Sequence, residues 1–347
     1  MTRVTVIVPT FQRGALIGRA LRSVLSQTYA DLQVCVYDNA STDNTAEEVR
    51  KLATGDARLR YHRQLANIGA FANFNDGMAH VETEFFSFLS DDDIIYPNFL
   101  ELAVSALDAN PDAMMFAGST LELNDEGGVQ YAPVARWPRE GRYDPPSGAW
   151  QMLDNKHPTW TGVLFRRAVI DRIGLLDAGA GTACDLEYEL DLAAHFPIVV
   201  SYQACAAYIR HEQAGSEREN TSVIAGYRYI ASKVAKDASL PARVRTALAK
   251  RLEKQLQIKL IEIAAKAAMR QDDVTAADAV RMLAHEPVTL AGIIALCAIP
   301  ICVRVPAARA ALQRIDRVRR HLRAKSAQRL DARARRKDTG GAQRARS

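Results

Sequence analysis

The chain has 347 residues, of which 48% are hydrophobic and 24% are charged. This length can bury one large core, or a core with an appended region, and the composition excludes a wholly disordered chain. The net charge of +5 conceals an asymmetry, because residues 304–347 contain 15 Lys and Arg but only 3 Asp. This tail therefore carries +12 and the preceding residues carry −7, which predicts that the tail meets an anionic surface.

The cysteines and the N-terminal residues indicate the cellular compartment in which the protein is expected. The five cysteines are odd in number and form no C-x-x-C pair. A disulfide framework and a zinc site are both disfavoured, and a reducing cytoplasm fits best. The apolar run after Met1 ends at Pro9 and is too short for a signal peptide, so export is not expected.

Residues 1–120 alternate strand and helix patterns. This alternation predicts an α/β fold with a mostly parallel sheet flanked by helices. Runs of β-branched and aromatic residues predict strands at 4–8, 33–37, 58–62, 85–89 and 113–117. Helical spacing predicts one helix after Gly14, one through Val49, one over 70–81 and one that opens at Pro97.

The pattern weakens after residue 120 and then returns. Pro133, Pro138, Pro145 and Pro146, with several glycines, predict a long irregular connection between 120 and 160. Regular elements are predicted again from 161: a strand at 161–165, a helix from Arg167, a Gly-rich loop at 179–181, a helix near 185–195, and strands at 197–202 and 206–209.

Beyond Ser222 the pattern is all helical. Residues 216–303 are therefore predicted to form a helical extension, and 304–347 a basic tail. Apolar residues recur at helical spacing along 244–267, and this stripe needs a partner surface. The partner is either the rest of the chain or a second copy in a homodimer.

Residues 288–303 contain no charged residue. A membrane span needs about 20 apolar residues, so this stretch is too short to cross a bilayer. An apolar stretch followed by a basic helix predicts instead that 288–330 lies on a membrane surface. A buried core helix followed by a solvated tail is the alternative. Nucleic-acid binding is disfavoured, because 304–347 contains no aromatic residue to stack on bases.

Three polar clusters follow predicted strands, at 9–13, 38–41 and 90–93. In an open α/β sheet ligands bind at the carboxyl ends of strands, so the three clusters are expected to form one site. The last cluster contains three adjacent carboxylates, which repel one another unless a cation offsets their charge. Mn²⁺ or Mg²⁺ would suit such oxygen ligands together with substrate phosphates. A solvated acidic turn before Pro97 is the alternative, which the preceding apolar strand disfavours.

Five motifs in order resemble family 2 glycosyltransferases with the GT-A fold. They are VIVPTF at 6–11, SVLSQTY at 23–29, YDNASTD at 37–43, NIG at 67–69 and FLSDDD at 88–93. Weaker similarity continues through Gly162, Asp185 and His211. The resemblance implies a glycosyltransferase domain over 1–215, with a nucleotide-binding half at 1–120 and an acceptor half at 121–215.

The resemblance also implies a role for particular residues. Those at the nucleotide-sugar donor are Pro9, Thr10, Phe11, Arg13, Asp38, Asn67, Gly69 and Asp91. Those at the metal are Asp92 as the main ligand, Asp93 and His211. Asn67 and Gly69 have an alternative reading as an ordinary turn. His211 has an alternative reading as an ordinary surface histidine.

Asp185 falls where the family carries its catalytic base. The family usually has Glu before this residue, whereas Cys184 stands here, so Glu187 stays a second candidate. A structural alternative for Asp185 is a helix N-cap. Trp160 is expected either to stack on an acceptor sugar or to fill the core.

The function implied is direct displacement with inversion, from a UDP- or dTDP-sugar to a glycan or lipid-linked glycan, at the inner face of the membrane. A non-catalytic nucleotide-sugar-binding scaffold in a polysaccharide assembly complex is the alternative. A sugar-phosphate nucleotidyltransferase is disfavoured, because residues 9–14 do not form the Gly-rich basic loop that it would need.

Overall fold

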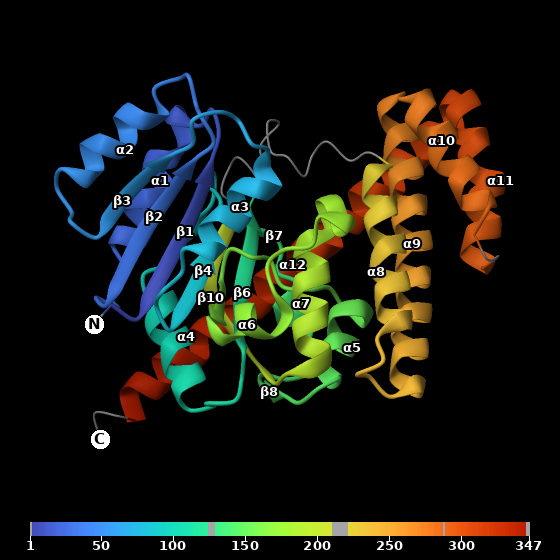
Figure 1. Cartoon of the computed structure of the whole chain (residues 1–347). Coiled ribbons are helices and arrows are strands. Elements are labelled where there is room, and N and C mark those ends of the chain that lie inside the picture. Colours follow the sequence, from blue (N-terminus) through green and yellow to red (C-terminus); the bar gives the residue numbers. More distant parts are fainter. Residues whose placement is uncertain (1, 124–128, 210–220, 287–288, 345–347) are drawn as a thin grey trace. The chain divides into compact units, whose positions relative to one another are not determined.

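A computed structural model of the chain describes residues 2–123, 129–209, 221–286 and 289–344 (Figure 1). The chain divides into two compact units. The first comprises 1–176, 188–211 and 325–347, and the second comprises 177–187 and 212–324. Residues 177–187, which carry Asp185 and Glu187, therefore group with the C-terminal helices.

The first unit is built on one mixed sheet. Its parallel part has the order β3-β2-β1-β4, from Leu59–Arg63, Leu32–Asp38, Val4–Thr10 and Phe85–Phe88. β9 (Val163–Arg166) joins this part, antiparallel on both sides, to β6 (Met115–Leu123). β10 (Ile198–Ile209) lies parallel to β6. The short strands β5 (Ile94–Ile95), β7 (Val129–Tyr131) and β8 (Gly141–Tyr143) add antiparallel pairings. The predicted α/β fold class is confirmed.

Helices bury both faces of the parallel strands (Figure 1). The helices of this part are α1 (Gly14–Leu25), α2 (Thr45–Ala53), α3 (Ala70–Ala79) and α4 (Phe99–Asp108). Alternate residues of β1 point to opposite faces, as strand geometry requires. Val6 and Val8 share a buried cluster with Ile17 of α1, whereas Ile7 lies against Gly77 of α3. Helix α4 starts two residues after Pro97, with Asn98 at its N-cap, so Pro97 precedes the helix rather than opening it.

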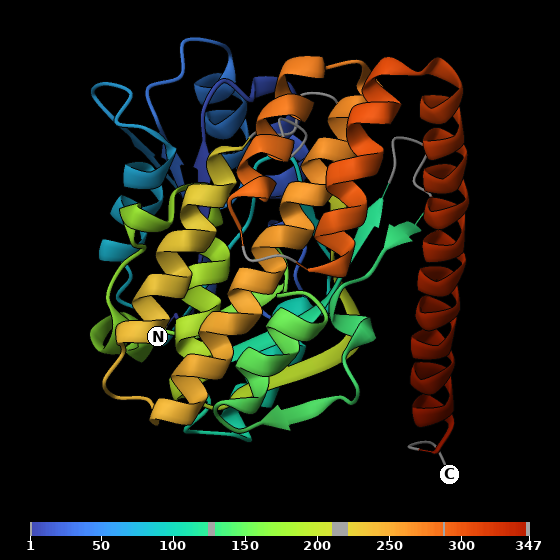
Figure 2. The ribbon, with the colours of Figure 1, turned by 90° about the vertical axis from the view of Figure 1, so that its right-hand side faces the viewer.

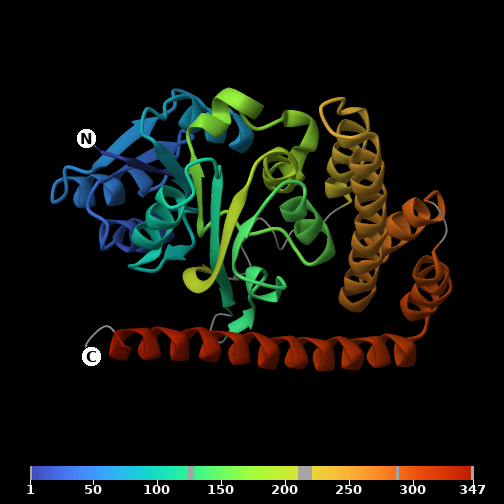
Figure 3. The ribbon, with the colours of Figure 1, turned by 90° about the horizontal axis from the view of Figure 1, so that it is seen from below.

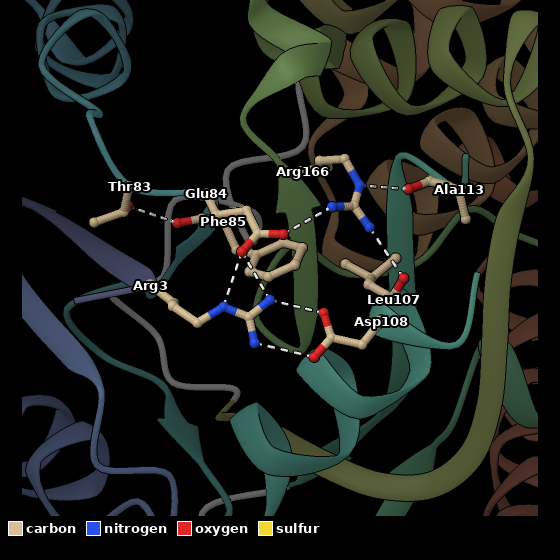
Figure 4. A network of polar contacts seen from close by, with 8 residues as sticks. All are labelled: Arg3, Thr83, Glu84, Phe85, Leu107, Asp108, Ala113 and Arg166. Carbon is tan, nitrogen blue, oxygen red and sulfur yellow. Dashed lines mark hydrogen bonds and ion pairs between the residues drawn. The ribbon is translucent and has the colours of Figure 1, made fainter. Parts of the chain in front are cut away.

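A network of charges ties the amino ends of the strands together (Figure 4). Arg3 donates to both Glu84, at 2.8 Å, and Asp108, at 2.7 and 3.0 Å. Arg166 donates to the other oxygen of Glu84 at 3.0 Å, and both guanidinium groups lie over the ring of Phe85. The network joins β1, β4, β9 and the end of α4, far from the strand ends where ligands are expected.

The region 120–160 is more regular than the sequence predicts. β6 continues to Leu123, and after the five residues outside the description the chain forms β7, a 3-10 turn at Val134–Arg136, β8 and α5 (Ser147–Asp154). The prediction of a long irregular connection was wrong, because these short elements depend on pairing with β6 and β10 rather than on local pattern. Similarly, the two strands predicted at 197–202 and 206–209 form one strand, β10, with irregularities between Val200 and Ala206.

The second unit is helical. It contains a 3-10 segment η2 (Ala178–Ala183), the start of α7 (Cys184–His195), α8 (Ser222–Lys236), α9 (Ala242–Arg270), α10 (Asp273–Ala284), α11 (Leu290–Arg304) and the first part of α12 (Pro306–Arg344), up to residue 324. α6 (Ala168–Ile173) precedes it in the first unit. Helices α8 to α11 lie side by side in Figure 2, and Figure 3 shows α12 as one continuous helix.

The predicted apolar stripe of α9 packs within the chain. Leu256, Ile263 and Ala267 share a buried cluster with residues of α10 and α11. This part of the stripe is therefore covered by intrachain packing and does not offer a dimer surface.

Helix α11 has one buried face, as the core-helix alternative for 288–303 requires, and the predicted membrane contact of this stretch stays a prediction. Ala295, Ile299 and Cys302 are buried in the helical core, whereas Ile294 and Ile301 on the other face are 59% and 53% exposed. Within the described ranges no one helix is both long and apolar enough to cross a membrane. Helix α11 and the first part of α12 pass that test only together, and they are bent by 119°.

Candidate active site

The turn after β1 lies against the loop after β2. Gln12 has a left-handed backbone with φ of 57°, and its amide donates to Ser41 Oγ at 2.9 Å. The next two amides donate to Thr45 Oγ1 and Asp43 Oδ2, both at 3.0 Å. Burial pushes the pKa of Asp43 upward, but hydrogen bonds from Thr45 and Gly14 outweigh it and lower the pKa. The first two polar clusters are thus held together by the backbone of 12–14.

Asp38 is fully buried at the end of β2. Its Oδ1 accepts from the Ser41 amide at 2.9 Å, and its Oδ2 accepts from the Tyr61 hydroxyl at 2.5 Å. Burial, with the adjacent carboxylate, raises the pKa of Tyr61. In this state Asp38 shapes the loop after β2, and its expected contact with a nucleoside stays a prediction.

The segment around Asn67 is fastened to the same loop. Asn67 Oδ1 accepts from the Asn39 side chain and from the Gly69 amide, both at 2.9 Å, and Asn39 Oδ1 accepts from the Ile68 amide at 2.8 Å. Gly69 has φ of 86°, a backbone conformation that favours glycine, and it precedes α3. The turn is therefore anchored beside the carboxyl end of β2, and its expected contact with the donor stays a prediction.

Asp91 follows β4 and faces the turn after β1. Its side chain is only 13% exposed, and its Oδ1 lies 3.6 Å from Nε of Arg13. Burial, and to a smaller extent the charge of Asp92, raise the pKa of Asp91 to about 6 although Arg13 opposes this. The neighbouring Asp92 is held through its main-chain carbonyl, which accepts from Arg19 at 2.5 Å. The three predicted polar clusters therefore meet at the carboxyl ends of β1, β2 and β4.

Asp93 has a different environment. It is 1% exposed, and its two oxygens accept from the Thr161 hydroxyl at 2.7 Å and from the Ile209 amide at 3.1 Å. Burial raises the pKa of Asp93 to about 7. Both oxygens already hold the ends of β9 and β10 in place, so this geometry favours a structural role over the predicted metal ligation.

The pair Asp91 and Asp92 fits a divalent cation. Two adjacent carboxylates, one of them largely buried with a raised pKa, are costly to ionise together unless a positive charge is near. Hard cations such as Mg²⁺ take this kind of oxygen ligand, usually one or two carboxylates with substrate phosphates. The residues present therefore suit the predicted Mn²⁺ or Mg²⁺.

The two candidates for the catalytic base differ in their partners. Both lie in the first turn of α7. Glu187 is 3% exposed and its Oε1 lies 2.5 Å from Nζ of Lys233 on α8, within the second unit. Asp185 is partly exposed and its Oδ1 accepts from the Leu186 amide at 2.7 Å. An ion-paired, buried carboxylate is poorly placed to accept a proton from a substrate, which favours Asp185.

The remaining predicted residues divide as follows. Phe11 is 42% exposed at the turn after β1. Trp160 stacks on Phe88 with ring centres 4.5 Å apart, which is the core-filling alternative, and its contact with an acceptor stays a prediction. Pro9 and Thr10 are the last two residues of β1. His211 lies outside the described residues.

Sequence reasoning missed several residues that build the site. Tyr61, Arg19, Thr161 and Lys233 each contact a predicted site residue or its backbone. Only Tyr61 gave any signal, as an aromatic residue in the strand predicted at 58–62. The others depend on contacts that become visible once the chain is folded.

Residues 5–174 match the family described as glycosyl transferase family 2. Through this stretch the chain belongs to glycosyl transferase family 2. The match covers all the residues of the three polar clusters and ends before segment 177–187. The predicted family is therefore confirmed for the half of the chain that holds the strand-end site.

Several curated glycosyltransferases share sequence with this family member. A GalNAc(5)-diNAcBac-PP-undecaprenol beta-1,3-glucosyltransferase of Campylobacter jejuni is 38% identical over 94 residues, 27% of this chain and 30% of that protein. WfgD of Escherichia coli, a UDP-Glc:alpha-D-GlcNAc-diphosphoundecaprenol beta-1,3-glucosyltransferase, is 32% identical over 122 residues, 35% of this chain and 47% of that protein. An uncharacterized glycosyltransferase of Rickettsia felis is 34% identical over 127 residues, 36% of this chain and 20% of that protein. The chain spans less than half the length of each of these relatives.

Solved glycosyltransferases share the fold over most of the chain. S. aureus TarS 1–349 in complex with UDP-GlcNAc superposes with a TM-score of 0.65 at 18% identity, over 96% of this chain and 92% of that one. The mannosyltransferase PcManGT of Pyrobaculum calidifontis, in complex with GDP-Man and Mn2+, gives 0.54 at 19% identity, over 90% and 86%. At these identities the likeness establishes a common fold and nothing about substrates.

Proposed function

We propose that this chain is an inverting glycosyltransferase that takes a sugar from a nucleoside-diphosphate donor. The proposal rests on one observation. Nε of Arg13 lies 3.6 Å from Oδ1 of Asp91 at the carboxyl ends of the strands, and the loop after Asp38 is hydrogen-bonded to the same turn through Ser41. A donor presents an aromatic base, a ribose and a diphosphate. The exposed Phe11, the loop after β2 and the charged pair at Asp91 offer surfaces for these groups in that order.

Asp92 and Asp91 are proposed to hold Mn²⁺ or Mg²⁺ at the diphosphate. Bound there, a divalent cation stabilises the charge that develops on the leaving nucleoside diphosphate. Arg13 adds a fixed positive charge beside the same carboxylate, which helps to retain the diphosphate. We assign Asp93 a structural role. His211 stays a metal ligand predicted from the family resemblance.

Asp185 is proposed as the general base. It accepts the proton of the acceptor hydroxyl while that oxygen attacks the anomeric carbon and the diphosphate leaves from the opposite side. One displacement of this kind inverts the anomeric configuration, so an α-linked donor gives a β-linked product. Finding the donor's configuration retained in the product would contradict this mechanism.

A lipid-linked glycan is the proposed acceptor, and a UDP- or dTDP-sugar the proposed donor. Two relatives carry names that specify undecaprenol-linked acceptors, and one of these names specifies UDP-Glc. A structural neighbour is known in complex with UDP-GlcNAc. Lipid-linked acceptors place the reaction at a membrane, and the five unpaired cysteines fit its cytoplasmic face.

Helix α12 supplies the proposed membrane contact. Ile315, Val318 and Leu322 follow one another at helical spacing and are 65%, 59% and 60% exposed. Ala308 and Leu312, on the same side of the helix, pack on the helical core. The apolar face of α12 therefore packs on the helical core at Ala308 and Leu312 and is exposed at Ile315, Val318 and Leu322.

The residues around this stripe favour an anionic lipid surface as its occupant. Five arginines lie between and beside the three apolar residues: Arg314, Arg317, Arg319, Arg320 and Arg323. Asp316 forms ion pairs with Arg319 and Arg320. An apolar strip with a basic border binds where acyl chains meet anionic headgroups.

Vesicle sedimentation tests the membrane contact. Replacing Ile315, Val318 and Leu322 together by Ser should weaken binding to phosphatidylserine-rich vesicles by about tenfold or more, because each side chain loses its burial. The matched control Val274→Ser removes an exposed apolar residue of α10 and should bind as the wild type does. Equal binding by the triple variant would exclude this surface.

The activity is tested by release of nucleoside diphosphate from a panel of UDP-, dTDP- and GDP-sugars with Mn²⁺. Release that requires both Asp92 and Asp185 supports the proposal. The alternative, a nucleotide-sugar-binding scaffold, draws its support from Cys184 in place of the family's Glu. Binding without release from any donor, with or without a lipid-linked acceptor, would favour that alternative.

A further inference from the structure

Segment 177–187, which carries Asp185, has its own internal turn. Asp177 Oδ1 accepts from the Gly179 amide at 2.8 Å at the start of η2. Gly181 interrupts the 3-10 turn with φ of 53° and ψ of −128°, and α7 then begins at Cys184. The segment is one short irregular loop followed by a first helical turn, so its own hydrogen bonds give it little rigidity.

Two side chains of helix α8 contact both ends of this segment. Lys233 Nζ lies 2.5 Å from Glu187 Oε1 and 3.8 Å from Asp177 Oδ2. The Tyr229 hydroxyl donates to the same oxygen of Asp177 at 2.6 Å. Residues 229 and 233 are one helical turn apart and therefore share a face of α8. One lysine thus bridges residue 177 and residue 187, and the loop between them is closed.

The middle of the segment is held by close backbone packing. Gly226 lies on the same face of α8, one turn before Tyr229, and a Cβ there would overlap the carbonyl oxygen of Ala180. A Cβ on Gly179 would overlap the Tyr229 ring. Two glycines therefore let α8 and the segment approach more closely than side chains would permit.

The ion pair matters because Glu187 is buried. Its side chain is 3% exposed, and that of Lys233 is 37% exposed. Exposed ion pairs contribute little to structure, but removing one partner of a buried pair leaves an uncompensated charge that must move to reach water. Lys233 therefore ties the first turn of α7, in which Asp185 lies, to α8.

We propose that Lys233 and Tyr229 of α8 are positioning residues for catalysis, which hold segment 177–187 so that Asp185 is presented in one orientation. This inference rests on the proposed role of Asp185 as the base. It gives the first helix of the C-terminal extension a part in the reaction, although that helix lies beyond the stretch that matches the family.

The test compares Lys233→Ala with a matched control on the same helix. Arg228→Ala also removes an ion pair of α8, the 2.5 Å contact with Glu286, but does not touch the segment. Turnover per nucleotide-binding site, donor KM and amide hydrogen exchange are measured for both variants. A misplaced catalytic group can cost up to about 100-fold in rate, so Lys233→Ala should lose roughly 10- to 100-fold in kcat.

Other readouts separate positioning from general destabilisation. In Lys233→Ala the donor KM should stay within about twofold, since only the base is displaced. Exchange should accelerate in 177–187 but not in α9 or α10, and Lys233→Arg should recover most of the rate. Arg228→Ala should keep the wild-type kcat. Tyr229→Phe, which keeps the ring and loses only the hydrogen bond to Asp177, serves if Lys233→Ala does not fold, and should lower kcat in the same direction.

An unchanged kcat in Lys233→Ala and Tyr229→Phe would overturn the inference. So would faster exchange throughout α9 and α10, because the loss would then be structural. A wild-type chain that binds donors but releases nothing from any of them is a failure of the proposed function instead, and it is seen before any variant is compared.

Discussion

The first and last residues of the acidic triplet, Asp91 and Asp93, contact different parts of the sheet. Asp91 lies beside Arg13 at the turn after β1, whereas both oxygens of Asp93 accept hydrogen bonds from the far strands of the sheet. Residues 91 and 92 lie in a turn that the Asp93 amide closes on the Ser90 carbonyl oxygen, so the three side chains do not share one direction and one acidic run can serve two purposes. We therefore propose a ligand-binding role for Asp91 and Asp92 and a structural role for Asp93.

Substitutions at Asp93 test this division. In Asp93→Asn the amide can accept from the Ile209 N–H and donate to the Thr161 hydroxyl, so folding and Mn²⁺-dependent nucleotide binding should be retained. Asp93→Ala leaves both partners without the carboxylate and should lower the free energy of unfolding by about 1–3 kcal/mol. Chemical denaturation and nucleotide titration are the measurements. If Asp93→Asn folds normally but loses Mn²⁺-dependent binding, Asp93 is a metal ligand after all.

The choice between Asp185 and Glu187 is also a residue-scale question. Asp185→Asn should reduce kcat by about 10²- to 10⁴-fold, the usual contribution of general base catalysis. Glu187→Gln can keep a hydrogen bond with Lys233 and should change kcat by less than about tenfold. The initial rate of nucleoside diphosphate release at saturating donor measures both. The reverse order of effects would assign the base to Glu187.

Few of these side-chain roles can be predicted from sequence. The order of motifs places Asp38 and Asp91 at strand ends, and the structure brings their loops together. The partner of Asp38 could not be predicted, because Tyr61 reaches it only through the parallel register that pairs Val36 with Tyr61. Likewise, nothing in the sequence near Glu187 indicates the lysine 46 residues later that pairs with it.

At the scale of elements, β4 and β9 are joined at their outer ends by the network of Arg3, Glu84 and Arg166 (Figure 4). The Arg166 side chain is only 14% exposed, and it also donates to the carbonyl oxygens of Ala113 and Leu107. It therefore fixes β9 and the end of α4 to the parallel strands.

Arg166→Ala should lower the free energy of unfolding by about 1–3 kcal/mol, because buried carbonyl groups lose their donor. The donor KM should not change, since the network lies at the amino ends of the strands. Arg142→Ala breaks exposed ion pairs with Asp112 and Asp144 and is the matched control, with no measurable loss expected. Equal unfolding midpoints for the two variants in urea would show that the network is not stabilising.

Helices and strands were predicted correctly where their own hydrophobic periodicity determines them. The prediction failed for strands that form only by pairing with a distant strand. The strands and helices of residues 1–110 follow their hydrophobic periods closely. β5 has two residues, and β7 and β8 have three each, which is too short to leave a periodic signal. β10 read as two strands because its register with β6 shifts between Val200 and Ala206.

In the chain as a whole, the residues proposed for the donor site and the proposed catalytic base belong to different units. The donor-site residues belong to the first unit, and the segment with the proposed base belongs to the second, together with α8 and the helical core. The charge divides the chain at a different point, since the first 303 residues carry −7 and the tail, which is shared between the two units, carries +12. The proposed donor site lies in the acidic part of the chain, so we propose that a cation accompanies the diphosphate there, and the basic part suits an anionic surface.

The most direct test of the central claim is a thermal-shift titration with nucleoside diphosphates, with and without Mn²⁺, on the wild type and on Asp92→Ala. A ligand that binds the native state raises the melting temperature, and the rise grows with the ratio of ligand concentration to Kd. We expect UDP or dTDP to raise the Tm of the wild type only when Mn²⁺ is present, and Asp92→Ala to abolish the rise. No shift with any nucleoside diphosphate, or an undiminished shift in Asp92→Ala, would contradict the claim.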